Sequence, residues 1–139
     1  MPSVRLEPRE HMPSSQPARV LIVDDKRENR TVFELMLQDE GYTLLTAESG
    51  EQALAMIASE PPDLVLLDVM MPGLDGFQVA AASSAGSATS KIPVIIVTAL
   101  GEDARIPGLE AGAGNVLTKP VERTELCARV RNLLQLRAQ

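Results

Sequence analysis

The amino-acid sequence predicts an α/β fold in which helices cover both faces of one parallel sheet. Three aliphatic runs of strand length support this prediction, because each is apolar and ends on a polar residue. Continuous apolar runs are typical of strands that are buried on both faces, as parallel strands are. Segments with helical spacing of apolar residues lie between the runs, so strands and helices alternate. The 139 residues suffice for one such domain.

Five strands are expected, of which the first, third and fourth have the strongest aliphatic pattern. In chain order they are residues 19–23, 42–47, 63–67, 93–97 and 115–118. The three strong runs end on acidic or hydroxyl side chains: Asp24 and Asp25 follow the first, Asp68 the second and Thr98 the third.

Helical spacing identifies the segments between the strands. The residues that show it are Val32, Leu35, Met36 and Asp39 in one segment, Ala53, Leu54 and Ile57 after Ser49 in another, and Leu126, Val130, Leu133 and Leu134 in the last. The last helix is expected to begin near Glu122 or Thr124. A short third helix is expected to lose its propensity after Ala82, and a fourth, within 102–111, is shortened or kinked by Pro107.

The alternation of five strands with five helices predicts a doubly wound (βα)5 sheet, and the flavodoxin-like strand order 2-1-3-4-5 fits it. In that order the first and third strands are neighbours, at the point where the strand order reverses. Ligands of such sheets bind there, beyond the carboxyl ends of the strands. Functional side chains are therefore expected at the strand ends.

Composition excludes several classes of function. The chain has 19 acidic and 13 basic residues and a net charge of −6, so direct binding of nucleic acid is not expected. Its one cysteine can form neither an internal disulfide nor a cysteine-rich metal site. Apolar runs of about four residues are far shorter than the roughly 20 that cross a membrane. The expected compartment is the cytoplasm, with a flexible proline-containing tail at 1–17 and one domain at 18–137.

Three carboxylates are expected to meet at the carboxyl ends of the first and third strands: Asp24, Asp25 and Asp68. Two like charges about 4 Å apart repel by roughly 4 kcal/mol at an effective dielectric of 20, so such a cluster needs a cation or a raised pKa. Oxygen ligands with open positions suit Mg²⁺. The plainer interpretation is that these residues cap the helices that follow them.

Thr98 and Lys119 follow the fourth and fifth strands, so both should reach the same edge of the sheet. An ammonium group can neutralise a phosphoryl oxygen, and a hydroxyl can donate a hydrogen bond to one. Together with a carboxylate nucleophile and a hard cation, these are the groups that phosphorylation of an aspartate requires. Taken singly, Thr98 is an ordinary strand-end residue and Lys119 an ordinary solvated charge.

These residues lie in four short motifs that resemble the receiver domains of response regulators in bacterial two-component signalling. The matching stretches are residues 20–25, 66–76, 97–99 and 117–120. Their order and spacing make the resemblance specific, and it extends over about residues 18–136.

The resemblance implies that Asp68 accepts a phosphoryl group from a sensor histidine kinase or a phosphotransfer protein. Lys119 and Thr98 would contact that group, and the Lys119–Pro120 peptide would be cis. The implied protein ligands of Mg²⁺ are the side chains of Asp24, Asp25 and Asp68 and the backbone carbonyl of Met70. The resemblance also implies a possible homodimer through the face formed by the fourth helix, fifth strand and fifth helix.

Such a domain is a switch whose chemistry acts on itself, and it is not an enzyme with a separate substrate. Two alternatives remain at this point. A receiver-like scaffold would signal without phosphate. The intact set of Asp24, Asp25, Asp68, Thr98 and Lys119 argues against it, but two departures leave it open: Val116 where the family often has an aromatic residue, and Pro107 in the expected fourth helix. A Mg²⁺-dependent phosphatase of the haloacid-dehalogenase type would need an aspartate where this chain has Met70. Lys26, Arg27 and Arg30 are expected to be solvated charges, with a kinase-docking surface as the alternative.

Overall fold

The computed structural model describes residues 17–68, 92–98 and 115–138. Within them lies a five-stranded parallel sheet with the strand order β2-β1-β3-β4-β5, which confirms the predicted topology. Four expectations fall on residues outside this description. They concern the tail, Met70, the short third helix that ends after Ala82, and the fourth helix at 102–111 with Pro107.

The observed elements agree with the predicted ones to within a residue or two at the strand ends. They are β1 (Arg19–Val23), α2 (Arg27–Leu37), the 3-10 helix η1 (Gln38–Glu40), β2 (Thr43–Ala47), α3 (Gly50–Ser59), β3 (Leu64–Asp68), β4 (Val94–Thr98), β5 (Asn115–Thr118) and α6 (Arg123–Ala138). β3 and β4 each run one residue further than predicted, so Asp68 and Thr98 are the last residues of their strands.

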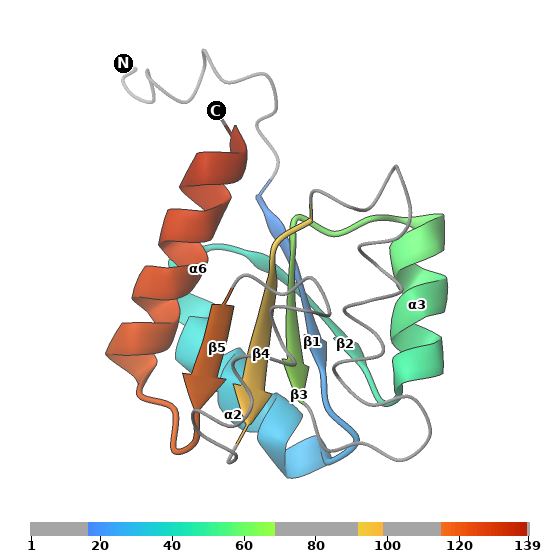
Figure 1. Ribbon diagram of the computed structural model, residues 1–139, viewed down its shortest axis with the longest axis horizontal. Coiled ribbons are helices and arrows are strands. Elements are labelled where there is room, and N and C mark those ends of the chain that lie inside the picture. The colour runs from blue at the N-terminus through green and yellow to red at the C-terminus, as the bar shows by residue number, and fades with distance from the viewer. Residues whose placement is uncertain (1–16, 69–91, 99–114, 139) are drawn as a thin grey trace, which may run out of the picture.

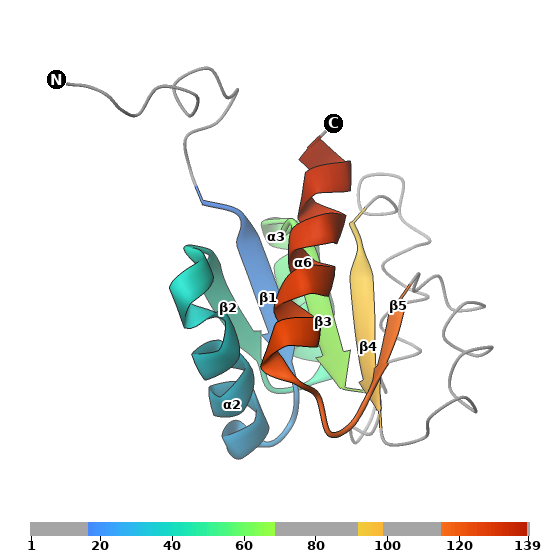
Figure 2. The ribbon, with the colours of Figure 1, turned by 90° about the vertical axis from the view of Figure 1, so that its left-hand side faces the viewer.

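Alternate residues of each central strand pack on opposite faces of the sheet. In β1, Val20 and Ile22 join the core on the α2 and α6 side, whereas Leu21 and Val23 join the core on the α3 side. Figure 2 shows α2 and α6 together on one face, with α3 behind the sheet. Because both faces are covered, β3 and β4 are buried along their whole length, which explains their unbroken aliphatic runs.

α2 presents a different face to the sheet from the one that the spacing of Val32, Leu35 and Met36 indicates. The buried residues of α2 are Phe33 and Leu37, four positions apart. Val32 and Leu35 are instead 46% and 55% exposed. The prediction of a helix is confirmed, but the predicted buried face is wrong for Val32 and Leu35, whereas Met36 packs partly buried against the core.

Two local signals fix the helix ends near the sheet. The Ser49 hydroxyl accepts a hydrogen bond from the Gln52 amide at 3.1 Å and so caps α3, as the position of Ser49 before the helix predicts. Gly41 ends η1 with a φ of 86°, a backbone conformation that favours glycine. The Gly41 turn leads the chain into β2, and the Ser49 cap starts the helix that follows β2.

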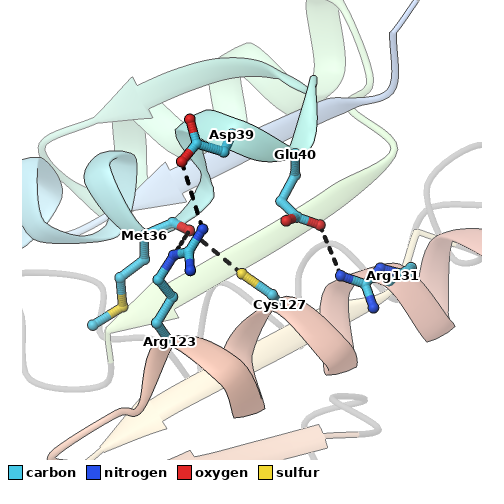
Figure 3. Close-up of polar contacts among 6 residues, drawn as sticks. All are labelled: Met36, Asp39, Glu40, Arg123, Cys127 and Arg131. Atoms are coloured by element: carbon cyan, nitrogen blue, oxygen red, sulfur yellow. Dashed lines mark hydrogen bonds and ion pairs between the residues drawn. The ribbon is translucent and has the colours of Figure 1, made fainter.

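α2 and α6 are joined by a group of polar contacts at the carboxyl-terminal end of α2, shown in Figure 3. We call this group the interhelical contact; its residues are Met36, Asp39, Glu40, Arg123, Cys127 and Arg131. The Met36 carbonyl accepts from Arg123 Nε at 3.2 Å and from Cys127 Sγ at 3.4 Å. Arg131 pairs with Glu40 at 3.0 Å and Arg123 with Asp39 at 3.6 Å.

Cys127 is a buried member of the interhelical contact, as the prediction of a small packing residue requires. Burial raises the pKa of its thiol, and the nearby Glu40 carboxylate adds to the increase. Within the part of the chain that the structure describes, no helix is long and apolar enough to cross a membrane.

Candidate functional site

The buried polar residues of the described chain are all found at the carboxyl ends of central strands. They are Asp24 after β1, Asp68 at the end of β3 and Thr98 at the end of β4. The parallel register places these ends together, because Val23 of β1 lies opposite Leu67, and Asp68 lies opposite Val97. The arrowheads of β3, β4 and β5 mark this edge at the bottom of Figure 1.

Three carboxylates converge at this edge, as the sequence predicts. Asp24, Asp25 and Asp68 each offer an oxygen, and these oxygens lie within 4.8 Å of one another. Two of the carboxylate oxygens, Asp24 Oδ2 and Asp25 Oδ1, are buried without a hydrogen-bond partner among the described residues. A buried acceptor that lacks a partner is costly, so this arrangement calls for a positive ligand.

The main chain and side chain of Asp24 are held by three elements. Its amide donates to the Ala47 carbonyl at the end of β2, at 3.2 Å. Its Oδ1 accepts from the Lys26 amide at 2.9 Å, and its carbonyl accepts from Arg30 Nη1 at 2.8 Å. Only Oδ2 remains for another ligand within the described structure.

The environment of Asp24 disfavours its charged form. Burial raises the pKa of the Asp24 carboxyl above its ordinary value, and the neighbouring Asp68 charge raises it further. Hydrogen bonds from the Lys26 amide and the Asn29 side chain, together with the Lys119 charge, act in the opposite direction. A cation among the three carboxylates would remove most of the repulsion that Asp24 experiences.

Lys119 supplies the cation that the sequence places at this edge. Its Nζ donates to Asp68 Oδ1 at 3.4 Å, while its own side chain is 34% exposed and that of Asp68 only 5%. The Lys119 amide donates to the Thr98 carbonyl at 2.8 Å, which fixes the residue beside the end of β4. The Lys119–Pro120 peptide is cis, as the resemblance implies.

The donor set fits a hard divalent cation. All the available ligands are carboxylate oxygens, two of them buried without a partner, and no histidine or thiol lies among them. Such a set suits Mg²⁺, which is bound by few protein oxygens and retains several waters. Asp24, Asp25 and Asp68 would hold it; Met70, the fourth implied ligand, is outside the described residues.

One contributor to the site was not predicted from the sequence. Arg30 was expected to be a solvated charge, but it is half-buried and its guanidinium binds the Asp24 carbonyl. The sequence offers only a weak signal for this contact, an arginine five residues after Asp25 on the first turn of a helix. Val116, where an aromatic residue was expected from the resemblance, packs half-buried against the core on the α3 side.

The sheet order and the acidic edge define a flavodoxin-like α/β domain with a candidate cation site, and comparison with known proteins identifies the family. The model of the response regulator receiver domain matches residues 20–131. The chain therefore belongs to the response regulator receiver family.

Curated relatives are similar over most of this chain. Response regulator PleD of Caulobacter vibrioides is 48% identical over 121 residues, which are 86% of this chain and 27% of PleD. The phosphate regulon transcriptional regulatory protein PhoB of Pseudomonas aeruginosa is 43% identical over 117 residues, 84% of this chain and 51% of PhoB. The chain thus spans between about a quarter and a half of the length of these relatives.

Solved structures share the fold over nearly their whole length. A putative response regulator from Chloroflexus aurantiacus has a TM-score of 0.83 and 40% identity, covering 86% of this chain and 99% of its own. The chemotaxis protein CheY4 of Vibrio cholerae has a TM-score of 0.78 and 30% identity, covering 84% and 98%. These similarities agree with the observed strand order.

Proposed function

We propose that this chain is a phosphorylation switch in which Asp68 accepts a phosphoryl group in a Mg²⁺-dependent reaction. The donor would be a phosphohistidine on a sensor kinase or on a phosphotransfer protein, and the expected compartment is the cytoplasm. Residues 18–137 would form the receiver unit, and residues 1–17 a flexible tail. Membership of the receiver family supports the class of function.

One observation carries the assignment to Asp68. This carboxylate is the member of the acidic cluster that also contacts Lys119, so it lies between the candidate cation site and a fixed ammonium group. A phosphoryl group on Asp68 would have positive charge available on two sides. Among the described residues Lys119 forms an ion pair with Asp68 but none with Asp24 or Asp25, which favours these two as cation ligands only.

The proposed reaction is an in-line transfer between the histidine nitrogen and a carboxylate oxygen. An oxygen of Asp68 forms a bond to phosphorus while the phosphorus–nitrogen bond of the donor breaks, and the electron pair of that bond stays with the imidazole. The product is an acyl phosphate on Asp68. As in other phosphoryl transfers, the protein contributes mainly positioning and charge neutralisation.

Each neighbouring group has a defined part in this chemistry. Bound Mg²⁺ would supply positive charge to the carboxylates and to the phosphoryl oxygens. Lys119 exchanges its contact with Asp68 for one with the phosphoryl group, and the Thr98 hydroxyl donates to a phosphoryl oxygen. Attack of water on phosphorus later breaks the bond to Asp68 and returns the carboxylate, so the chain is reset without turnover of a separate substrate.

The output of the switch is a change in partner contacts. Rearrangement of the segments that follow β3 and β4 would bias a two-state equilibrium toward the partner-binding form. A homodimer through the face that contains β5 and α6 is one such partner interaction. Because the named relatives are longer than this chain, a further output domain in this protein belongs to the same proposal.

The test is the mass of the intact protein after incubation with acetyl phosphate or phosphoramidate, with and without Mg²⁺. We expect one phosphoryl adduct that requires Mg²⁺ and is absent in Asp68→Asn. The matched control is Asp39→Asn, which removes an exposed carboxylate outside the cluster and should keep the adduct. An adduct that persists in Asp68→Asn would contradict the assignment, and a folded protein without any adduct would favour the phosphate-independent scaffold.

A further inference from the structure

The first turn of α2 contains a side chain that reaches back to the acidic cluster, and its contact lies outside the chemistry described above. We propose that Arg30 is a positioning residue for the cation site: by binding the Asp24 carbonyl it holds the Asp24 carboxylate within the acidic cluster. This inference rests on the proposed function, because it assumes that the cluster binds a divalent cation.

The hydrogen bonds of Asp24 show what Arg30 contributes. The amide, the carbonyl and Oδ1 of Asp24 are each bound to protein, by Ala47, Arg30 and Lys26 respectively. Each partner comes from a different place: the end of β2, the helix α2 and the turn between β1 and α2. Oδ2 is the one polar atom of this residue left without a partner in the described structure. Oδ2 is therefore the oxygen of Asp24 that is left for a cation.

Arg30 matters in particular because the start of α2 has no side-chain cap of its own. Lys26 occupies the cap position with an extended backbone and makes no side-chain capping bond. The turn is closed by the Lys26 carbonyl, which accepts from the amides of Asn29 and Arg30 at 3.1 and 3.2 Å. Arg30 thus binds the Lys26 carbonyl through its amide and the Asp24 carbonyl through its guanidinium. Removing the guanidinium would remove one of the three contacts that hold Asp24 and the only one made by its carbonyl among them.

Coulomb interactions and positioning predict opposite effects for loss of the Arg30 charge. A positive group near three carboxylates repels an incoming cation, so neutralising it should strengthen cation binding if charge alone mattered. If Arg30 positions a ligand, the same substitution should weaken binding, because outer groups that orient metal ligands typically change metal affinity by 10–100-fold. The sign of the change separates the two roles.

Arg27 provides a matched control. It lies on the same turn of α2, carries the same charge and is exposed, and it makes no hydrogen bond or ion pair with the other described residues. Arg27→Met and Arg30→Met each remove one positive charge from the same helix end. Only the second removes a hydrogen bond to Asp24.

The experiment is a titration of the full chain with Mn²⁺, in which electron paramagnetic resonance measures the free ion. We expect Arg30→Met to raise the Kd for Mn²⁺ about tenfold or more relative to wild type. Arg27→Met should leave the Kd unchanged or slightly lower. Arg30→Lys, which keeps a long cationic donor, should recover part of the affinity. In acetyl phosphate reactions, Arg30→Met should need more Mg²⁺ for half-maximal phosphorylation, with a smaller change in the rate at saturation.

The outcomes distinguish this inference from the proposed function. Wild type that binds Mn²⁺, together with an Arg30→Met variant of equal or higher affinity, overturns the positioning role and leaves the cation site standing. Wild type that does not bind Mn²⁺ overturns the cation site and the inference with it. If Arg30→Met does not fold, the same titration on Arg30→Gln decides, because glutamine is too short to reach the Asp24 carbonyl by the same path.

Discussion

The acidic cluster at the strand ends and the interhelical contact between α2 and α6 are both polar, but they are built in opposite ways. In the interhelical contact, charges of opposite sign meet at the surface: Arg123 and Asp39 are 55% and 75% exposed. In the cluster, charges of the same sign are gathered where Asp24 and Asp68 are 0% and 5% exposed. Exposed pairs of opposite charge contribute little to stability, whereas buried like charges reduce it.

This difference indicates what each region is for. The interhelical contact needs no added ligand, since every charged group shown in Figure 3 has a partner of opposite charge. The cluster leaves two carboxylate oxygens without a partner in the described residues and raises the pKa of one carboxyl. Proteins retain an unfavourable electrostatic arrangement of this kind where a ligand compensates for it, and this is typical of a binding site.

The largest expected effect is that of Mg²⁺ on the stability of the wild-type chain. Binding to the folded state alone should raise the free energy of unfolding by about 2.7 kcal/mol when Mg²⁺ is at one hundred times its Kd. Urea denaturation with and without Mg²⁺ measures the change. Asp68→Asn should lose most of this gain, whereas Arg131→Met, in the interhelical contact, should keep it. An unchanged denaturation midpoint in wild type would remove the contrast between the two regions.

A smaller effect is expected when the repulsion in the cluster is relieved by substitution. Asp24→Asn keeps an Oδ1 acceptor for the Lys26 amide and removes the buried charge, so without Mg²⁺ we expect a gain on the order of 1 kcal/mol near neutral pH. Because the pKa of Asp24 is raised in the folded state, the penalty of its charge is full above that pKa and disappears as the pH falls toward the ordinary value of 3.8. The gain of Asp24→Asn over wild type should therefore shrink on acidification.

Denaturation of both proteins across this pH range measures the difference, and Asp39→Asn serves as the exposed control. A gain that stayed constant or grew as the pH fell would show that the charge of Asp24 carries no penalty.

The smallest effect is expected in the interhelical contact. Arg131→Met breaks the ion pair with Glu40, whose arginine partner is exposed, and should lower the free energy of unfolding only slightly. Arg123→Met should cost up to about 1 kcal/mol, since it also removes a hydrogen bond to the Met36 carbonyl. Neither should alter the Kd for Mn²⁺. A loss well above these values would mean that the contact is a main source of stability.

The sequence predicted the sheet and the cluster because both depend on local pattern and on general topology. Aliphatic runs that end on Asp25, Asp68 and Thr98 identify buried strands, and a parallel sheet brings the ends of its strands to one edge. No contact needed to be known in advance. The same argument predicts that Lys119 reaches this edge, since β5 ends beside β4; its contact with Asp68 was implied only by the family resemblance.

The contacts that the sequence could not predict involve backbone carbonyl groups, which a sequence pattern does not distinguish from one another. Arg30 binds a backbone carbonyl, and so does Arg123; any residue supplies a carbonyl, so only the folded geometry shows which one is reached. The prediction of the buried face of α2 was wrong for a related reason. Phe33 and Leu37 lie four residues apart and Val32 and Leu35 three, and both spacings place apolar residues on one face of a helix. The packing of α2 on β1 and α6 decides which of the two faces is buried.

The order of the site residues along the chain has a consequence for the protein during its synthesis. Asp24, Asp25 and Asp68 emerge from the ribosome early, but Lys119 follows β5, the last strand of the sheet. An unfinished chain therefore carries Asp68 without the ammonium group that pairs with it in the complete fold. Under the proposed chemistry we expect such a chain to accept a phosphoryl group only after the final strand has joined the sheet.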